Sequence, residues 1–271
     1  MDCKKFKVFK HTKEKEIPGK DPELNEKEHL YDLLIHDLTG PLSIAATSTA
    51  NLLHKSDRYG PLTERQERLV ERILRNVHKA QTLLQEMIEI SRSEEGIFKK
   101  EFFSVEKALR ESLIDVLETN APHAAEKLYH IEDSKELESL LKPHGISIEI
   151  TGKYCRSSFC HDQKKVRQIF RNLMSNAMKY RREWMRVSIR GELDLLISVK
   201  DDGMGIPPGD QEAVFKRFVR LSDKRRSDVP GFGLGLTGVK ALVEAMKGEI
   251  TLVSQEGAGT QFTVRIPPLQ P

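Results

Sequence analysis

A reactive side chain stands near the start of the chain, in the stretch HDLTGPLSI at residues 36–44. There His36 and Asp37 form an ionisable pair within a long helical pattern, and Gly40 and Pro41 follow. A neutral imidazole nitrogen can act as a nucleophile. Proline inside a helix removes a backbone hydrogen bond and costs about 3 kcal/mol. The stretch therefore indicates a kink, a functional site or both, and the pair alone does not decide between them.

A second candidate is the polar face of a helix that the pattern predicts over about residues 163–181, with Asp162 as its cap. Asn172 and Asn176 are four residues apart and share one face, and Lys179 follows three residues later. Amide oxygens can ligate a hard cation such as Mg²⁺, and a lysine can meet phosphate. The alternative is an ordinary polar surface, which is the commoner meaning of such a face taken alone.

A third candidate is the stretch DDGMGIP at residues 201–207, which follows a predicted strand. Its glycines, Gly203 and Gly205, allow a tight turn and the close approach of a ligand. Asp201 at the strand end could accept a hydrogen bond from the exocyclic amine of a base. An ordinary Asx turn is an equally good interpretation of these residues on their own.

The fourth candidate is a glycine-rich entrance to a helix over about residues 234–247, formed by Gly231, Gly233 and Gly235. Backbone N–H groups and the helix dipole suit phosphate there. The stretch lacks the Gly-Lys-Ser/Thr of a Walker A loop and the βαβ context of a dinucleotide-binding turn. The basic residues before it would form a mobile lid over a phosphate site or a solvated loop.

Two amphipathic helices account for the first third of the chain. Leucines recur every four residues in the pattern from about Pro22 to His54, and KSDRYGPL then breaks the helix. Thr63 with Gln66 forms a capping box for a second helix that ends near residue 94. Such a hairpin cannot enclose a core alone, so it would pair with a second copy in a four-helix bundle or pack on the downstream domain.

The remainder alternates strands and helices, which predicts a mixed sheet covered by helices on one face. Ser104 would cap a helix after the strand EFFSV, and EGAGTQF would turn between the last two strands. The expected strands are EFFSV, ISIEIT, MRVSIR, LDLLISVK and TQFTVRI, and the expected helices cover about residues 105–142, 163–181 and 234–247.

The composition of the 271 residues excludes several classes of protein. A formal net charge of +3 gives no case for nucleic-acid binding, and no apolar run is long enough to span a membrane. Three cysteines do not make a disulfide scaffold, and Cys155, Cys160 and His161 are better explained as a strand edge than as metal ligands. We expect a cytoplasmic protein with a solvated basic arm at its N-terminus, which could also touch acidic lipid or a partner.

Taken in order, these stretches resemble the sensor histidine kinases of two-component systems over about residues 25–271. HDLTGPL resembles the phosphoacceptor H box of that family, NLMSNAMKY its N box and DDGMGIP its G1 box. VFKRF resembles its F box, GFGLGLTGVK its G2 box and GAGTQF its terminal glycine turn. Six matches in the family's order argue against a chance resemblance.

The resemblance implies a multi-domain α and α/β fold. A basic arm (residues 1–22) would precede a dimerisation and histidine phosphotransfer domain (23–96), whose hairpin forms a dimeric four-helix bundle. Residues 97–271 would form an ATP-binding catalytic domain, an α/β sandwich of the Bergerat type. Implied with it are ATP and Mg²⁺, a homodimer, and a response-regulator receiver domain whose Asp takes the phosphoryl group.

Carried over to this chain, the resemblance implies that His36 is phosphorylated and that Asp37 orients its imidazole and takes its proton. Pro41 would give the helix a place to bend. Asn176, helped by Asn172, would hold Mg²⁺. The implied nucleotide contacts are Lys179 and Arg217 on the phosphates, Tyr180 and Asp201 at the adenine, Gly203, Gly205, Ile206, Gly231, Gly233, Leu234, Gly235, Leu236 and Thr260 in the surrounding loops, and Phe215 and Phe218 as anchors of the lid.

Three departures from the family pattern stand out. Gly40 replaces the usual Thr or Asn four positions after the histidine, which predicts weak phosphatase activity. Residues 121–141 lengthen the first helical region of the ATPase domain, as a surface extension or a docking element. No sensor domain is recognisable, so input would come from a separate sensor protein or through the basic arm, or the chain is a piece of a longer protein.

Three other functions are alternatives. The chain could be an ATP-binding pseudokinase that acts as a scaffold. It could also be another ATPase of the same fold, although such chaperone or mismatch-repair proteins use a catalytic Glu where this chain has Asn172 and lack a helix like that of His36. The third is a protein kinase of the anti-sigma type, which shares the ATP-binding fold but lacks the phosphoacceptor hairpin.

Overall fold

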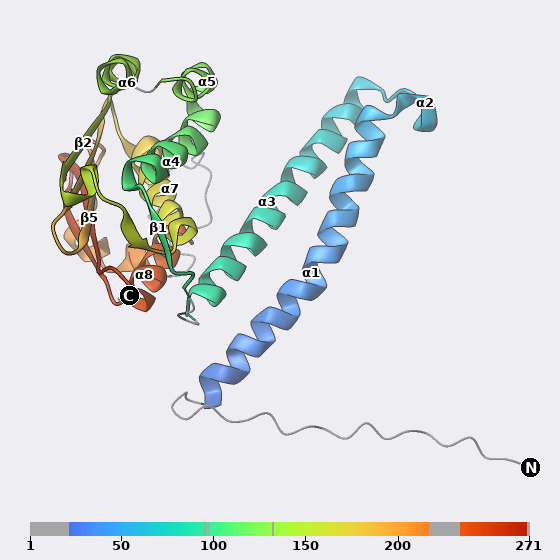
Figure 1. Cartoon of the computed structure of the whole chain (residues 1–271). Coiled ribbons are helices and arrows are strands. Elements are labelled where there is room, and N and C mark those ends of the chain that lie inside the picture. The colour runs from blue at the N-terminus through green and yellow to red at the C-terminus, as the bar shows by residue number, and fades with distance from the viewer. Residues whose placement is uncertain (1–21, 95, 97, 132, 217–233, 270–271) are drawn as a thin grey trace, which may run out of the picture.

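The structure is a computed structural model that describes residues 22–94, 96, 98–131, 133–216 and 234–269. A long helical hairpin stands beside an α/β domain, and the two meet where α3 of the hairpin packs on α8 (Figure 1). None of the described helices combines the length and apolar character that a bilayer span needs.

The hairpin consists of α1 (Pro22–His54) and α3 (Glu64–Glu94), with the single-turn helix α2 (Ser56–Tyr59) at the bend. The predicted capping box is confirmed, because the Thr63 N–H donates to Gln66 Oε1 at 2.9 Å and the Gln66 N–H donates to Thr63 Oγ1 at 3.4 Å. α1 continues through Pro41 without ending there.

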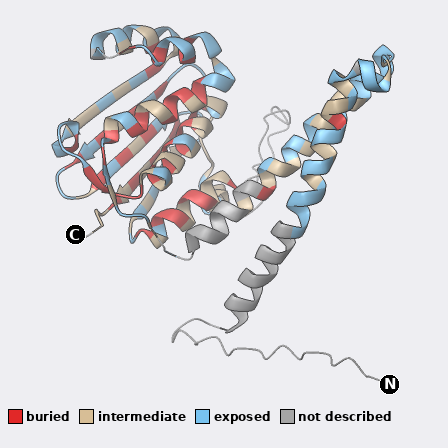
Figure 2. Cartoon of the chain, turned by 45° about the vertical axis from the view of Figure 1, so that its right-hand side comes forward, coloured by how far each residue is buried: buried red, intermediate tan, exposed pale blue. Residues whose placement is uncertain are grey.

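Much of the described part of the hairpin is exposed in the single chain (Figure 2). Several of its exposed residues have large apolar side chains. Leu38 of the predicted leucine row is 50% exposed and Ile44 is 69% exposed. On α3, Leu69 and Ile73 are also exposed. Two helices therefore do not bury their own apolar faces, as expected from the sequence, and pairing with a second copy stays a prediction.

The α/β domain is built on a five-stranded sheet that is mixed, as predicted. Two strands, β3 and β6, were not among the five predicted strands, and the predicted strand EFFSV pairs with β3 in a separate sheet instead of joining the five. Its order is β2-β4-β5-β7-β6, in which β2 and β4 are parallel and every other pair is antiparallel. A separate antiparallel pair joins β1 to β3. The strands are β1 (Glu101–Phe103), β2 (Ile146–Gly152), β3 (Phe159–His161), β4 (Met185–Gly191), β5 (Leu195–Asp201), β6 (Glu249–Gln255) and β7 (Gly259–Ile266).

Helices α4 (Val105–Asn120), α7 (Gln163–Tyr180) and α8 (Gly235–Ala245) cover one face of the five-stranded sheet (Figure 1). The core lies between them, with Phe170 and Leu173 of α7 packed toward strand residues such as Ile197. The predicted caps are confirmed: Ser104 accepts from the Lys107 N–H and Asp162 from the Lys165 N–H. These caps fix where α4 and α7 begin.

The prediction of a single helix over residues 105–142 is wrong. Three helices stand there instead: α4, α5 (Pro122–Leu128) and α6 (Ser134–Leu141), followed by a single 3-10 turn. Ala121 has φ −153° and ψ 70°, outside the helical region, because the ring of Pro122 disfavours a helical residue before it. Asp133 then caps α6 through the N–H groups of Lys135 and Glu136.

Phe170 and Phe102 provide a matched test of this core. Phe170 is fully buried, whereas Phe102 is 70% exposed. We expect Phe170→Ala to lower the free energy of unfolding of the α/β domain by about 3–5 kcal/mol, because it removes apolar contacts and leaves a cavity. Phe102→Ala should change it by less than about 1 kcal/mol. Urea denaturation followed by circular dichroism measures both, and equal losses would contradict the described core.

Candidate active site

Asp201, at the end of β5, is the centre of the candidate site. Its side chain is 5% exposed and its Oδ1 accepts a hydrogen bond from the Gly203 N–H at 2.8 Å. Burial raises the pKa of this carboxyl, while hydrogen bonds from the backbone N–H groups of Gly203 and Thr260 act in the opposite direction. The carboxylate is thus a buried acceptor aligned by backbone, which suits the exocyclic amine of a base.

Glycines allow three turns to meet around Asp201. These turns are the turn after α7, the DDGMGIP turn at residues 201–207 and the turn between β6 and β7. A methyl group on Gly203 would lie 2.4 Å from the carbonyl oxygen of Tyr180, the last residue of α7. One on Gly259, which has φ +101°, would lie 2.0 Å from the carbonyl oxygen of Asp201. One on Gly205, at φ +73°, would lie 1.9 Å from that of Gln255. Side chains at these positions would push the turns apart, so glycine is needed there.

Ser254 of β6 holds the DDGMGIP turn against the sheet. Its Oγ accepts from the Ile206 N–H at 2.8 Å, donates to the Gly259 carbonyl at 2.9 Å and lies 3.0 Å from Thr260 Oγ1. Gln211 adds a second tie, since its Nε2 donates to the carbonyl oxygens of Ile206 and Ser254. The sequence did not reveal either residue, because a polar side chain on an alternating edge strand or in a loop carries no distinctive signal.

The face of α7 with Asn172, Asn176 and Lys179 borders the buried face of the same helix. The three predicted side chains are half-buried, and the apolar residues Leu173 and Ala177 between them belong to the core. The helix period therefore places the two amides on one side, as predicted. Oxygen atoms from two such amides could contribute to a Mg²⁺ site.

Asp202 fixes the turn that follows α7. Its Oδ1 accepts from the N–H groups of Arg182, Glu183 and Trp184 at 3.0–3.1 Å. Burial acts to raise the pKa of this carboxyl, but the backbone hydrogen bonds outweigh it and the pKa is lowered. The sequence analysis missed this role, which joins residues about twenty positions apart.

The start of α8 forms another side of the site. Leu234 is buried, while Gly235 and Leu236 are half-buried. The hydroxyl of Thr237 is buried and, within the part of the chain that the structure describes, has no hydrogen-bond partner. Thr237 was not among the predicted contacts, and its unsatisfied hydroxyl makes it a candidate for one.

Phe215, one of the two predicted anchors of the lid, packs beside the sheet. Its ring packs edge-on against Phe262 of β7, with centroids 6.1 Å apart, and Lys240 Nζ lies 5.7 Å from the Phe215 centroid. The other predicted residues of the lid and glycine loop, Arg217, Phe218, Gly231 and Gly233, lie outside the described residues.

The predicted phosphoacceptor stands on a different element. His36 and Asp37 belong to α1, where Asp37 is exposed and the side chain of His36 lies outside the described part of the structure. The structure therefore brings Tyr180, Asp201 and the glycine turns together in the α/β domain, and it keeps the histidine in the hairpin.

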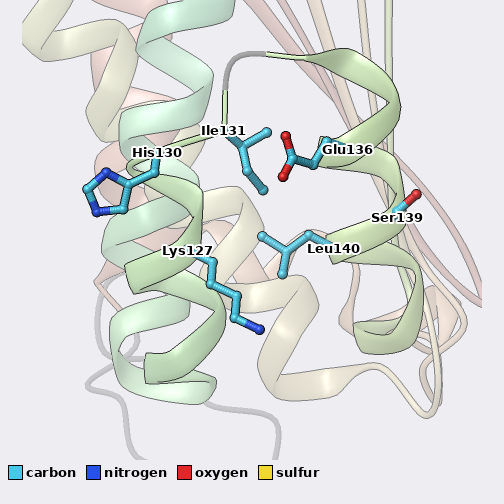
Figure 3. Close-up of a pocket in the computed structure, with 6 residues that line it drawn as sticks. All are labelled: Lys127, His130, Ile131, Glu136, Ser139 and Leu140. Carbon is cyan, nitrogen blue, oxygen red and sulfur yellow. The ribbon is translucent and has the colours of Figure 1, made fainter.

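A pocket of about 420 Å³ between α5 and α6 is separate from this site. Figure 3 shows Ile131, Leu140 and Glu136 directed toward its interior and His130 pointing away from it. Lys127 and Ser139 complete the lining. None of the predicted site residues lines this pocket, which lies in the extension at residues 121–141.

The buried acid, the glycine turns and the polar helix face lie on a mixed sheet with helices on one side, and this arrangement is consistent with an ATPase domain of the Bergerat type. Residues 161–270 match the family described as histidine kinase-, DNA gyrase B- and HSP90-like ATPases. This match, together with relatives that are named sensor histidine kinases, confirms the predicted resemblance to sensor histidine kinases.

Two curated histidine kinases are similar to this chain over different lengths. The chain is 44% identical to the sensor histidine kinase WalK of Bacillus subtilis over 111 residues, which cover 39% of this chain and 18% of WalK. It is 28% identical to the circadian input-output histidine kinase CikA of Synechococcus elongatus over 236 residues, which cover 86% of this chain and 29% of CikA. The chain thus spans less than a third of either relative.

One solved structure shares the fold over most of the chain. It is full-length ShkA in complex with AMPPNP, with a TM-score of 0.65, 21% identity and coverage of 90% of this chain and 46% of ShkA. At this level of identity the likeness concerns the fold.

Gly259 and Gly257 test whether the close approach of the turns matters. Both have positive φ, but a methyl group on Gly257 meets nothing within 4 Å, whereas one on Gly259 overlaps the Asp201 carbonyl. Gly257→Ala should cost about 1–2 kcal/mol of unfolding free energy from backbone strain alone. Gly259→Ala should cost about 2–5 kcal/mol because overpacking adds to that strain. The comparison is made by denaturant titration, and equal costs would refute the crowding at Asp201.

Proposed function

We propose that the chain is an ATP-dependent histidine autokinase of a two-component system, which phosphorylates His36 and passes the phosphoryl group to an Asp of a response-regulator receiver. The observation that carries the proposal is the buried Asp201 carboxylate, where three turns meet because Gly203, Gly205 and Gly259 carry no side chain. The relatives named as histidine kinases support it. Residues 23–96 would dimerise and carry the histidine, and residues 97–271 would bind ATP.

The proposed nucleotide site offers ATP one buried acidic side chain and several polar side chains around it. Asp201 would accept from the adenine amine, with Tyr180 and Thr260 nearby. Lys179 and Arg217 would neutralise phosphate charge, and the glycines would let backbone approach the nucleotide. Ile206, Leu234 and Leu236 would supply apolar contacts, and Phe215 and Phe218 would anchor the lid.

Mg²⁺ would be held by Asn176 and Asn172. The donor set fits, because both amides are half-buried on one face of α7 and Mg²⁺ prefers oxygen ligands, usually with retained waters and substrate phosphates. When bound, the ion supplies positive charge beside the phosphates.

The chemical step belongs to the hairpin. An imidazole nitrogen of His36 attacks the γ-phosphorus, an N–P bond forms, and the bond from that phosphorus to the oxygen of the leaving ADP breaks. Asp37 orients the ring and takes the imidazole proton. The exposed apolar residues of α1 and α3 support a homodimer, whose four-helix bundle would hold these helices in place.

The direct test is incubation with γ-labelled ATP and Mg²⁺, with the wild-type chain beside His36→Gln. We expect acid-labile, base-stable label on the wild type, and at least a hundredfold less on His36→Gln because the glutamine amide is not a nucleophile of comparable strength. His54→Gln, at the end of α1, is the control and should retain the label. Bound ATP without label on any chain would favour the scaffold alternative.

Gly40 is the reason that we expect weak phosphatase activity toward the receiver. The side chain that the family uses to position water for dephosphorylating the receiver is missing at this position. A methyl group on Gly40 would meet nothing within 4 Å, so Gly40→Thr fits the helix without a clash. We expect the variant to dephosphorylate a phosphorylated receiver at least about tenfold faster than the wild type.

The receiver's loss of phosphate is followed with and without the kinase chain. Gly40→Ala serves as the control, because it adds a methyl group without a hydroxyl. An unchanged rate in Gly40→Thr would refute this explanation of the weak phosphatase activity.

A further inference from the structure

The segment that joins α3 to β1 is fastened to the start of α7. The Lys99 N–H donates to Asp162 Oδ2 at 3.0 Å, across 63 positions of the sequence. One residue earlier, the Phe98 ring packs edge-on against His161, with ring centroids 5.3 Å apart. Burial lowers the pKa of His161 to about 4, so this ring is neutral at ordinary pH and packs as an aromatic group.

Asp162 uses its two oxygens for two different elements. While Oδ2 accepts from the linker, Oδ1 accepts from the Lys165 N–H at 3.1 Å and so caps α7. The residue is only 8% exposed. One shielded carboxylate therefore joins the segment leaving the hairpin to the helix that carries Asn172 and Asn176.

Glu101 of β1 reinforces the same junction. Its Oε1 accepts from the Gln163 N–H at 3.1 Å, which engages another free N–H at the start of α7. Its Oε2 lies 2.9 Å from Lys99 Nζ, and this contact with Lys99 is the main reason that the pKa of Glu101 is lowered. Linker, β1 and α7 thus share one set of hydrogen bonds.

The junction shortens the tether between the hairpin and the α/β domain. α3 ends at Glu94, and Phe98 is already packed on the domain, so four residue steps separate the two bodies. An extended chain of that length spans at most about 14 Å. If the contacts of Phe98 and Lys99 with the domain were lost, the first residue fixed on the domain would be Glu101, which pairs with β3. Glu101 is seven residue steps after Glu94, so the tether could then span about 25 Å.

We propose that Asp162 is a positioning residue for the phosphoryl transfer: its carboxylate ties the α3–β1 linker to the N-terminus of α7 and so sets how the nucleotide faces the hairpin. This inference rests on the proposed kinase function. Within the described part of the chain, the carboxylate of Asp162 accepts from Lys99 and Lys165, and neither is a predicted nucleotide contact. Its loss should therefore change the rate of transfer and leave the binding of ATP in place.

The size of the effect follows from the tether. Lengthening the tether from four to seven residue steps lowers the effective concentration of the α/β domain near the hairpin by about twofold. Loss of a fixed orientation adds to this, since the reacting atoms must be aligned. We expect the rate of His36 phosphorylation at saturating ATP to fall roughly three- to tenfold.

Two substitutions break the linker bond by different routes in the full chain. Lys99→Pro removes the N–H donor and leaves Asp162 as it is, and Lys99→Gln is its control, because it removes the ammonium but keeps the N–H. Asp162→Ser retains a hydroxyl that can cap α7 but has no second oxygen for the linker. Asp133→Ser makes the same change at the cap of α6, away from the linker.

Single-turnover labelling gives the rate and the ATP concentration for half-saturation of each variant. Lys99→Pro and Asp162→Ser should both lose rate with half-saturation changed less than twofold, and both controls should match the wild type. Unchanged rates in Lys99→Pro and Asp162→Ser, or equal losses in rate and in ATP affinity, would overturn the positioning role.

Hydrogen exchange separates this inference from the function on which it rests. The Lys99 amide should be protected in the wild type and exchange at least tenfold faster in Asp162→Ser. Equal exchange would show that the junction does not hold, whatever the activity. A wild-type chain that takes no label would instead remove the proposed function, and with it the role in transfer.

Discussion

The close approach of three turns around one buried carboxylate is the constraint on which the site depends. Asp201 can be buried because backbone N–H groups of Gly203 and Thr260 satisfy it, and the turns can meet there because Gly203 and Gly259 carry no side chain. The acceptor is then placed by the sheet itself, since Asp201 and Thr260 are paired residues of β5 and β7. A base bound at this position would be read by a rigid part of the fold.

Helix α7 is held at both of its ends by aspartates. Asp162 caps its first turn and accepts from the linker, and Asp202 gathers the N–H groups of the turn after its last residue. Between them, the core fixes the rotation of the helix through residues such as Phe170. Asn172 and Asn176 therefore stand on an element with little freedom, whereas the proposed phosphoryl transfer needs movement between the two bodies.

Local signals in the sequence predicted much of this arrangement. The caps at Thr63, Ser104 and Asp162, the hairpin, the five predicted strands and the glycine turns depend on neighbouring residues, and the structure confirms them. The strands β3 and β6 were not among those predicted. Pro122 was the local signal that the predicted helix over residues 105–142 ignored. By contrast, the contacts of Ser254, Asp202 and Asp162 with distant backbone depend on how strands and helices meet, which no local pattern encodes.

The most direct test of the account is the affinity of Asp201→Asn for an ATP analogue that is not hydrolysed, measured by calorimetry with Mg²⁺ beside the wild type. Asparagine keeps the shape of the side chain and an oxygen for the Gly203 N–H, but it loses the charge that the adenine amine would meet. The account predicts at least tenfold weaker binding and loss of preference for adenine over guanine nucleotides. Equal affinity in a folded Asp201→Asn chain would contradict the placement of the base at Asp201.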